Sequence, residues 1–297
     1  MEGQCEGGNC SIYRSSATIN TLIHTSSWGG AGLQQVKVRS LNRKHTLNPS
    51  AKEDTKTALV TGGARRIGAA IVRKLHAADY KVIIHCHHSL QEAQCLAADL
   101  NAHRPHSAWV LQKELTAPGA AEEMLTSVQE WTTRLDLLVN NASVFIRTDL
   151  TTFADTDWYS LFDIHVKAPF LLCLAARPLL AKHSGAIINI TDIHAQKPLK
   201  EYSVYCQSKA ALEMQTKSLA REFAPEIRVN AIAPGATAWP ENFNSLTPEA
   251  KEKIIAKTPL KKHGDPDCIA QAVLALAENS FITGQILKVD GGRSLLG

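Results

Sequence analysis

Short apolar runs alternate with longer segments of helical spacing along the chain after residue 55. The runs end in glycine, asparagine or other polar residues, as buried strands do. The segments between them carry apolar residues three or four positions apart, as amphipathic helices do. The pattern predicts strands at 57–60, 81–86, 107–112, 135–139, 186–190 and 227–232, and helices at 67–75, 90–102, 120–132, 158–180 and 203–223.

This alternation predicts the fold class. Strands that alternate with helices form a parallel sheet with helices on both faces, so we expect an α/β fold: one doubly wound parallel sheet over residues 55–297. Ligands bind such sheets at the carboxyl ends of the strands. Four polar segments fall at predicted strand ends: 61–68, 140–143, Asp192, and Pro234 with Gly235. We therefore expect one shared site.

Residues 1–54 have a different texture. They are rich in Ser, Thr, Asn and Gly and show no sustained period, which predicts a disordered or loosely attached extension. Residues 11–50 contain basic residues but no Asp or Glu, as in an organellar transit peptide, whereas the acidic Glu2 and Glu6 argue against one. Synthesis that begins downstream is a third possibility. We expect a cytoplasmic protein and leave organellar transit open.

Charge and cysteine content narrow the partners. Of the net charge of +4, the first 56 residues contribute +3, with seven basic and four acidic residues, so the rest is nearly neutral. That balance argues against nucleic acid as a partner. No apolar run approaches the roughly 20 residues of a membrane helix, which argues against a membrane partner. The seven cysteines include no C-x-x-C pair, so we expect a reducing compartment and no metal.

The segment 61–68, Thr-Gly-Gly-Ala-Arg-Arg-Ile-Gly, stands between a predicted strand and a predicted helix. Glycines there let a ligand approach the backbone, and the helix N-terminus offers N–H groups to an anion. We therefore expect a phosphate site that includes Gly62, Arg66, Ile67 and Gly68.

The second predicted strand ends in His85, His88 and Ser89, and no acidic residue follows until Glu92. A site for NAD would place a carboxylate here to bind the ribose 2′-hydroxyl. Hydrogen-bond donors without a carboxylate, together with Arg66, suit a 2′-phosphate and therefore NADPH. The alternative is that the histidines only form a polar strand end.

Tyr205 and Lys209 are four residues apart on a predicted helix and so share one face. A lysine ammonium beside a phenol favours the phenolate, so we expect a lowered pKa for Tyr205 and a proton that can be released near neutral pH. Asp192, at a strand end, could lie beside it. Alternatively, Tyr-x-x-x-Lys is a common pair on any helix.

The order Thr-Gly-x-x-x-x-x-Gly, Asn-Asn-Ala, Tyr-x-x-x-Lys and Pro-Gly resembles the short-chain dehydrogenase/reductase family from residue 56 to the C-terminus. The resemblance implies a Rossmann-type fold, a nicotinamide cofactor and a homotetramer. It implies that the cofactor lies against Asn141, Ala142, Pro234 and Gly235, and that Lys209 binds the nicotinamide ribose.

Finer features resemble the pteridine reductase branch of that family. Arg66 stands where most relatives have the middle glycine of the turn, and Asp192 stands thirteen residues before Tyr205, where other members have serine. The branch implies that Ser143 and Phe145 bracket a pterin, while Asp192, Tyr205 and Lys209 form the catalytic set. A carboxyl group suits reduction of a ring C=N bond that is protonated at nitrogen. The substrates implied are dihydropterins, dihydrofolate or fully oxidised pterins.

Two residues depart from the branch. His165 replaces a structural asparagine of the long central helix, and His88 replaces an arginine of the phosphate patch. Two other functions therefore stay open. One is a reductase of 3-oxoacyl thioesters or small ketones, which Asp192 disfavours. The other is an inactive nucleotide-binding sensor, which intact Tyr205 and Lys209 disfavour.

Overall fold

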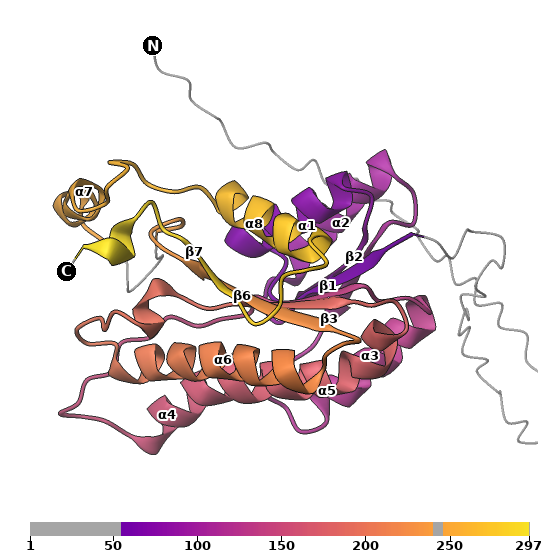
Figure 1. The fold of residues 1–297 in the computed structure, drawn as a ribbon, viewed down its shortest axis with the longest axis horizontal. Coiled ribbons are helices and arrows are strands. Elements are labelled where there is room, and N and C mark those ends of the chain that lie inside the picture. Colours follow the sequence, from indigo (N-terminus) through magenta and orange to yellow (C-terminus); the bar gives the residue numbers. More distant parts are fainter. Residues whose placement is uncertain (1–54, 240–245, 297) are drawn as a thin grey trace, which may run out of the picture. The chain divides into compact units, whose positions relative to one another are not determined.

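The computed structural model describes residues 55–239 and 246–296, and the predicted N-terminal extension lies outside them. The described chain forms a parallel sheet of seven strands in the order β3-β2-β1-β4-β5-β6-β7 (Figure 1). The strands are β1 (Thr57–Val60), β2 (Lys81–Cys86), β3 (Ala108–Gln112), β4 (Leu137–Asn140), β5 (Ala186–Ile190), β6 (Arg228–Pro234) and β7 (Ile286–Val289). The α/β fold with a doubly wound parallel sheet is confirmed.

Helices cover both faces of the sheet. One face carries α1 (Arg66–Ala77), α2 (Leu90–His103) and α8 (Pro266–Glu278), and the other carries α3 (Ala120–Trp131), α5 (Ala168–Ala181) and α6 (Ser203–Glu222), as Figure 1 shows. The chain crosses from one side of β1 to the other between β3 and β4. The carboxyl ends of β1 and β4 therefore flank the point where a doubly wound sheet binds its ligands.

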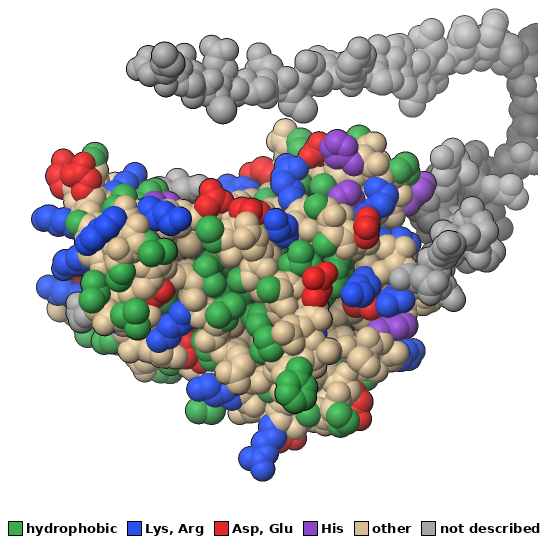
Figure 2. Space-filling view, turned by 45° about the horizontal axis from the view of Figure 1, so that its top comes forward, with side chains coloured by type: hydrophobic (Ala, Val, Ile, Leu, Met, Phe, Trp, Pro, Cys, Tyr) green, Lys and Arg blue, Asp and Glu red, His purple; other side chains and the backbone are tan. Residues whose placement is uncertain are grey.

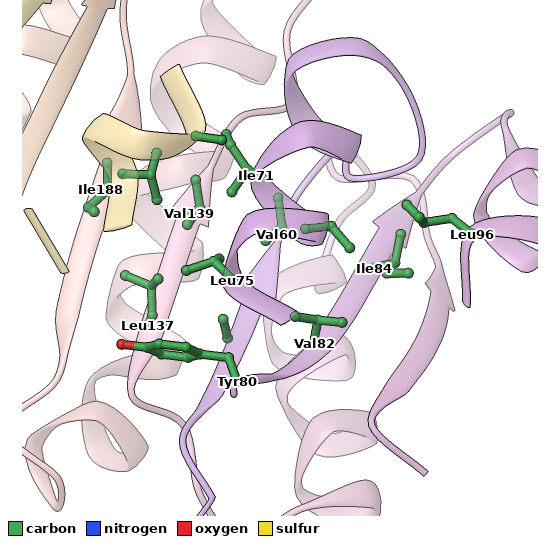
Figure 3. Close-up of a cluster of buried hydrophobic side chains, with 14 of the residues drawn as sticks. Val60, Ile71, Leu75, Tyr80, Val82, Ile84, Leu96, Leu137, Val139 and Ile188 are labelled. Carbon is green, nitrogen blue, oxygen red and sulfur yellow. The ribbon is translucent and has the colours of Figure 1, made fainter. Parts of the chain in front are cut away.

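The sheet is buried on both faces because its strands are continuous apolar runs. All four residues of β1 and all five of β5 are buried. On the α1 face, Val60, Val82, Val139 and Ile188 of four neighbouring strands pack under Ile71 and Leu75 of α1 (Figure 3). A second cluster fills the opposite face beneath α3, α5 and α6. This packing fixes the strand ends and so fixes the site.

One predicted helix is interrupted. The expected helix 158–180 begins earlier, as α4 (Asp155–Phe162), and passes through a π-helical turn, η1 (Asp163–Lys167), before α5. The backbone N–H of Ala168 bonds to the carbonyl of Asp163, five residues earlier, which is the π-helical pattern, and Pro169 follows at the start of α5. Such turns are common at functional sites, and this one holds His165.

The combined helix Asp155–Ala181 is long and apolar enough to cross a membrane by length and composition, and 44% of its most apolar window is buried inside the protein. Its apolar residues Leu172, Ala176 and Leu180 belong to the core beneath the sheet.

Basic side chains are unevenly distributed on the surface. In Figure 2, Lys and Arg side chains gather at the left end, where Figure 1 places the lysine-containing helix α7 (Pro248–Ala256).

Candidate active site

A cavity of about 640 Å³ opens at the carboxyl ends of β1, β4, β5 and β6. The shared site expected at these strand ends is therefore present. Most predicted site residues line it: Gly62, Arg66, Ile67, Gly68, Ser89, Asn141, Ala142, Ser143, Phe145, Asp192, Tyr205, Pro234 and Gly235. His85, His88 and Lys209 are not among its lining residues.

The glycine turn after β1 is held too tightly for side chains. Gly62 has a φ of +60°, which disfavours other residues, and a Cβ on Gly68 would lie 2.0 Å from the Gly62 carbonyl oxygen. The Asn141 amide donates to the carbonyls of Thr61 and Gly62, at 2.9 and 3.0 Å. The end of β4 therefore supports the turn, and Asn141 acts as a brace as well as a cavity wall.

Thr61 is a site residue that the sequence analysis missed. Its buried hydroxyl oxygen accepts hydrogen bonds from the backbone N–H groups of Asn141 and Ala142, at 2.9 and 3.0 Å. It thereby fixes the segment after β4 against the glycine turn. Its place directly before the first glycine, at a strand end, was the signal that could have identified it.

Arg66 takes a conformation typical of glycine, with a φ of +52°. Its guanidinium group donates to the carbonyls of Ala238 and Trp239, at 3.1 and 2.7 Å. Arg66 therefore joins the turn after β1 to the segment after β6, across the mouth of the cavity. Trp239 lines the cavity and stacks on His263 at a ring-centroid distance of 4.2 Å.

His85 does not belong to the phosphate patch, contrary to the expectation from the sequence. Its side chain is 2% exposed, and its Nδ1 accepts the backbone N–H of Gly62 at 3.2 Å. Its Nε2 lies 3.0 Å from the Lys113 carbonyl oxygen. Burial lowers the pKa of His85 to about 4, so the ring is neutral at pH 7 and supports the turn from behind.

His87, rather than His88, faces the cavity at the end of β2. His88 is exposed and packs on the His87 ring at a centroid distance of 3.6 Å. His87 itself lies 2.7 Å from the carboxylate of Glu114. The residues that can meet an anion here are therefore His87 and Ser89, with Arg65 and Arg66 on the neighbouring turn.

Asp192 and Tyr205 form a direct pair. The Tyr205 hydroxyl donates to Oδ2 of Asp192 at 2.8 Å, while Oδ1 of Asp192 accepts the backbone N–H of His194, also at 2.8 Å. Burial and the carboxylate of Asp192 raise the pKa of Tyr205 well above its ordinary value of 10. The expected lowering of this pKa is therefore wrong for the protein without ligands, and Tyr205 holds its proton.

Lys209 explains that correction. Its ammonium group is turned to the Ile190 carbonyl oxygen, at 3.0 Å, and lies 5.8 Å from the centroid of the Tyr205 ring. Burial lowers the pKa of Lys209 to about 8, and Asp192 opposes that shift. Lys209 therefore lies beneath Tyr205 and contacts the end of β5 rather than the phenol oxygen.

The residues expected to bracket a substrate lie on the other side of Tyr205. Phe145 stacks on Tyr202 at 4.3 Å and meets Tyr205 edge-on at 4.9 Å, so one face of its ring is covered. Ser143 lies in the cavity wall, 2.8 Å from Nε2 of His165.

Three further polar residues of this end of the cavity were missed: Arg147, His194 and Arg293. Arg147 lies 3.2 Å from the Tyr202 hydroxyl and 3.5 Å from the carboxylate of Glu201. Burial lowers the pKa of Arg293, and the negative charge of Asp192 opposes that shift. Arg293 follows the last strand by several residues, so no local pattern placed it at the site.

The cavity suits a nucleotide with several phosphates. The turn leaves no room for a Cβ on Gly68, the N-terminus of α1 faces the cavity, and cationic or hydroxyl side chains surround it. Asn141, Ala142, Pro234 and Gly235 continue the same wall toward Tyr205, so a dinucleotide can extend from the turn to Tyr205.

Comparison with known proteins agrees with this geometry. A family described as enoyl-(acyl carrier protein) reductase matches residues 62–294. Pteridine reductase 1 of Leishmania tarentolae is 33% identical, covering 84% of this chain and 99% of its own, and a putative ketoacyl reductase of granaticin polyketide synthase from Streptomyces violaceoruber is 33% identical, covering 80% and 96%. A solved structure of FolM alternative dihydrofolate reductase 1 from Brucella suis, in complex with NADP, is 35% identical with a TM-score of 0.76, covering 82% and 97%.

Proposed function

The chain belongs to the short-chain dehydrogenase/reductase family, and within that family we propose that it is an NADPH-dependent pteridine reductase. Its substrates are dihydropterins or dihydrofolate, with fully oxidised pterins as further candidates. The observation that carries the proposal is the hydrogen bond from Tyr205 to Asp192, at 2.8 Å. A serine here would only bind a carbonyl oxygen, whereas a carboxylate beside a protonated phenol suits a ring nitrogen that accepts a proton.

The donor set supports NADPH as the cofactor. Arg65, Arg66, His87 and Ser89 face the part of the cavity next to the glycine turn, where a 2′-phosphate would be bound. The solved relative from Brucella suis contains NADP. When bound, the nicotinamide supplies hydride chemistry. The protein's part is to hold the ligand between Asn141 and the segment after β6.

Tyr205 and Asp192 supply the proton in this proposal. The phenol stays protonated because it is buried beside a carboxylate. Its O–H donates to Asp192 in this structure and would turn from Asp192 to a substrate nitrogen to deliver the proton. Asp192 holds that O–H in position, and its other oxygen is fixed by the backbone of His194. Ser143 and Phe145, which both line the cavity, bound the space in which the substrate ring lies.

The test is the oxidation of NADPH, followed by its absorbance, with dihydrobiopterin, dihydrofolate and an acetoacetyl thioester side by side, and again with NADH. Turnover of a pterin with NADPH is the expected result. Turnover of the thioester alone would favour the ketoreductase, which the resemblance to the granaticin enzyme keeps as the second candidate.

Tyr205→Phe separates an enzyme from a nucleotide-binding sensor. The enzyme loses at least about a hundredfold in turnover because its proton donor is gone, while NADPH binding persists. Tyr80→Phe is the matched control, since Tyr80 is a buried tyrosine directly before β2, at the opposite end of the sheet. Equal activity of Tyr205→Phe and the wild type would exclude this mechanism.

A homotetramer is part of the proposal. Large apolar side chains are exposed on α4, α5 and α6, on one side of the sheet: Trp158, Tyr159, Phe170, Leu174 and Met214. Exposed apolar clusters of this kind mark protein interfaces. Analytical ultracentrifugation should give four times the 32.3 kDa protomer mass, and a monomer would contradict the assignment.

A further inference from the structure

His165 lies buried in the π-helical turn η1 and connects three polar groups. Its Nε2 lies 2.8 Å from the hydroxyl of Ser143 and 3.3 Å from the backbone nitrogen of Val144. Its Nδ1 lies 2.9 Å from the hydroxyl of Ser208. The side chain is 1% exposed, so no bulk water takes part in these contacts.

These contacts select one tautomer. The backbone N–H of Val144 can only donate, so Nε2 of His165 is an acceptor and carries no proton. The hydroxyl of Ser208 donates to the carbonyl of Tyr205 at 2.8 Å, so it accepts from His165, and Nδ1 carries the proton. In the opposite tautomer, the Nε2–H of His165 would face the backbone N–H of Val144. The Ser208 hydroxyl would then donate to Nδ1 and could no longer donate to the Tyr205 carbonyl.

The ring is also neutral. Burial and the positive charge of Lys209 lower the pKa of His165 well below its ordinary value of 6.5. A protonated His165 ring would donate from Nε2 to the Ser143 hydroxyl and so reverse the direction of that hydrogen bond. Because its pKa is lowered, the protonated ring is not the form at pH 7. The hydroxyl proton of Ser143 therefore points to Nε2 rather than to the more distant carbonyl oxygen of Val144, at 3.4 Å, because two acceptors cannot share a contact of 2.8 Å without a proton between them.

We propose that His165 is a positioning residue that makes Ser143 a hydrogen-bond acceptor toward the cavity, so that the site selects substrates with an N–H donor. Ser143 lines the cavity, and its hydroxyl proton is committed to His165, which leaves oxygen lone pairs for the ligand. The inference rests on the proposed function and deepens it. The amino group and ring N–H of a pterin are such donors, whereas the reacting carbonyl of a thioester offers only an acceptor.

The first test needs no substrate. Nitrogen-15 spectra of histidine-labelled protein, with the His165 signals assigned by their loss in His165→Asn, should show Nδ1 protonated and Nε2 unprotonated at pH 7. A protonated Nε2 would overturn the proposal whatever the enzyme reduces. Ser208→Ala removes the acceptor of the Nδ1 proton and should produce a mixture of both tautomers. If a single tautomer persists in this variant, Ser208 does not determine the tautomer of His165.

The second test is a double-mutant cycle on KM. Ser143→Ala and His165→Asn should each raise KM for dihydrobiopterin about fivefold, as loss of one hydrogen bond does, and leave KM for NADPH unchanged. The double variant should be no worse than Ser143→Ala, because His165 acts through Ser143. Multiplying effects, or a rise in both KM values, would show a merely structural role. A wild type that reduces no pterin refutes the proposed function, while the tautomer is still decided by the spectra.

Discussion

The buried ammonium group of Lys209 should make the protein more stable as the pH rises above neutrality. Lys209 is 2% exposed, and burial lowers its pKa from 10.5 to about 8. Substitution of Lys209 by Met keeps the length and apolar stem of the side chain but removes the charge. The difference between the two proteins across pH then reports the cost of burying that charge.

The sign follows from proton uptake. Between its folded and unfolded pKa values, the unfolded lysine binds a proton that the folded one does not, so the free energy of unfolding rises with pH in that window. A pKa near 8 against 10.5 gives a rise of about 2 kcal/mol between roughly pH 7 and 9.5. Below this window Lys209 is protonated in both states, so the effect of burying its charge on the free energy of unfolding no longer changes with pH. Cysteines such as Cys86 and Cys206, whose pKa values are raised by burial, act in the opposite direction but are common to both proteins.

Urea unfolding at several pH values, at one fixed protein concentration, measures this difference. The wild type should gain about 2 kcal/mol relative to Lys209→Met between roughly pH 7 and 9.5. Lys217→Met is the matched control, since Lys217 lies exposed on the same helix and should leave the slope of the wild type unchanged. Parallel curves for wild type and Lys209→Met would refute the conclusion that Lys209 is buried with a lowered pKa.

Three further outcomes are expected. Arg66→Gly should be more stable than Arg66→Ala by about 1 kcal/mol in thermal or urea unfolding, because both lose the guanidinium group but only glycine relieves the positive φ; equal stability would contradict the strain. His85→Gln should lose less stability than the wild type as the pH falls from 6.5 toward 4. In the wild type, His85 binds a proton in this range when the protein is unfolded but not when it is folded. Urea unfolding at two pH values measures the difference. Asp192→Asn should lower the pKa of Tyr205, measured by ultraviolet titration, and reduce pterin turnover about a hundredfold.

The strands could be predicted because most of them are continuous apolar runs in the sequence. The expected bounds of β1, β2 and β5 agree with the structure residue for residue. The π-helical turn in the long helix was not predictable from periodicity, because one extra residue in a single turn leaves the apolar spacing of the flanking helices unchanged. Strand β7 was not predicted either, since it is only four residues long and partly exposed.

The site residues that could be predicted from the sequence are those whose backbone forms the cavity wall. Those that could not be predicted depend on the direction in which the side chain points. The glycine turn, Asn141 and Gly235 lie at strand ends, and the fold carries them to the cavity whatever their rotamers. The histidines at the end of β2 differ. His85 lies within β2 and accepts a hydrogen bond from the turn after β1, whereas His87 and His88 lie beyond Cys86, where β2 ends, so strand alternation does not set their directions.

Asp192 both anchors the loop after β5 and contacts Tyr205. One carboxylate oxygen caps the short turn Ile193–Ala195 through the backbone N–H of His194, and the other accepts a hydrogen bond from the Tyr205 hydroxyl. Asp192 is also the one acidic residue among the described residues that line the cavity, which include Arg65, Arg66, Arg147 and Arg293. A cavity so cationic attracts a polyanionic cofactor. The negative charge of Asp192 lies beside the Tyr205 hydroxyl and attracts Arg293. Arg293 is half-buried, and Asp290 also opposes the lowering of its pKa, so Asp192 supplies part of the negative charge near this guanidinium group.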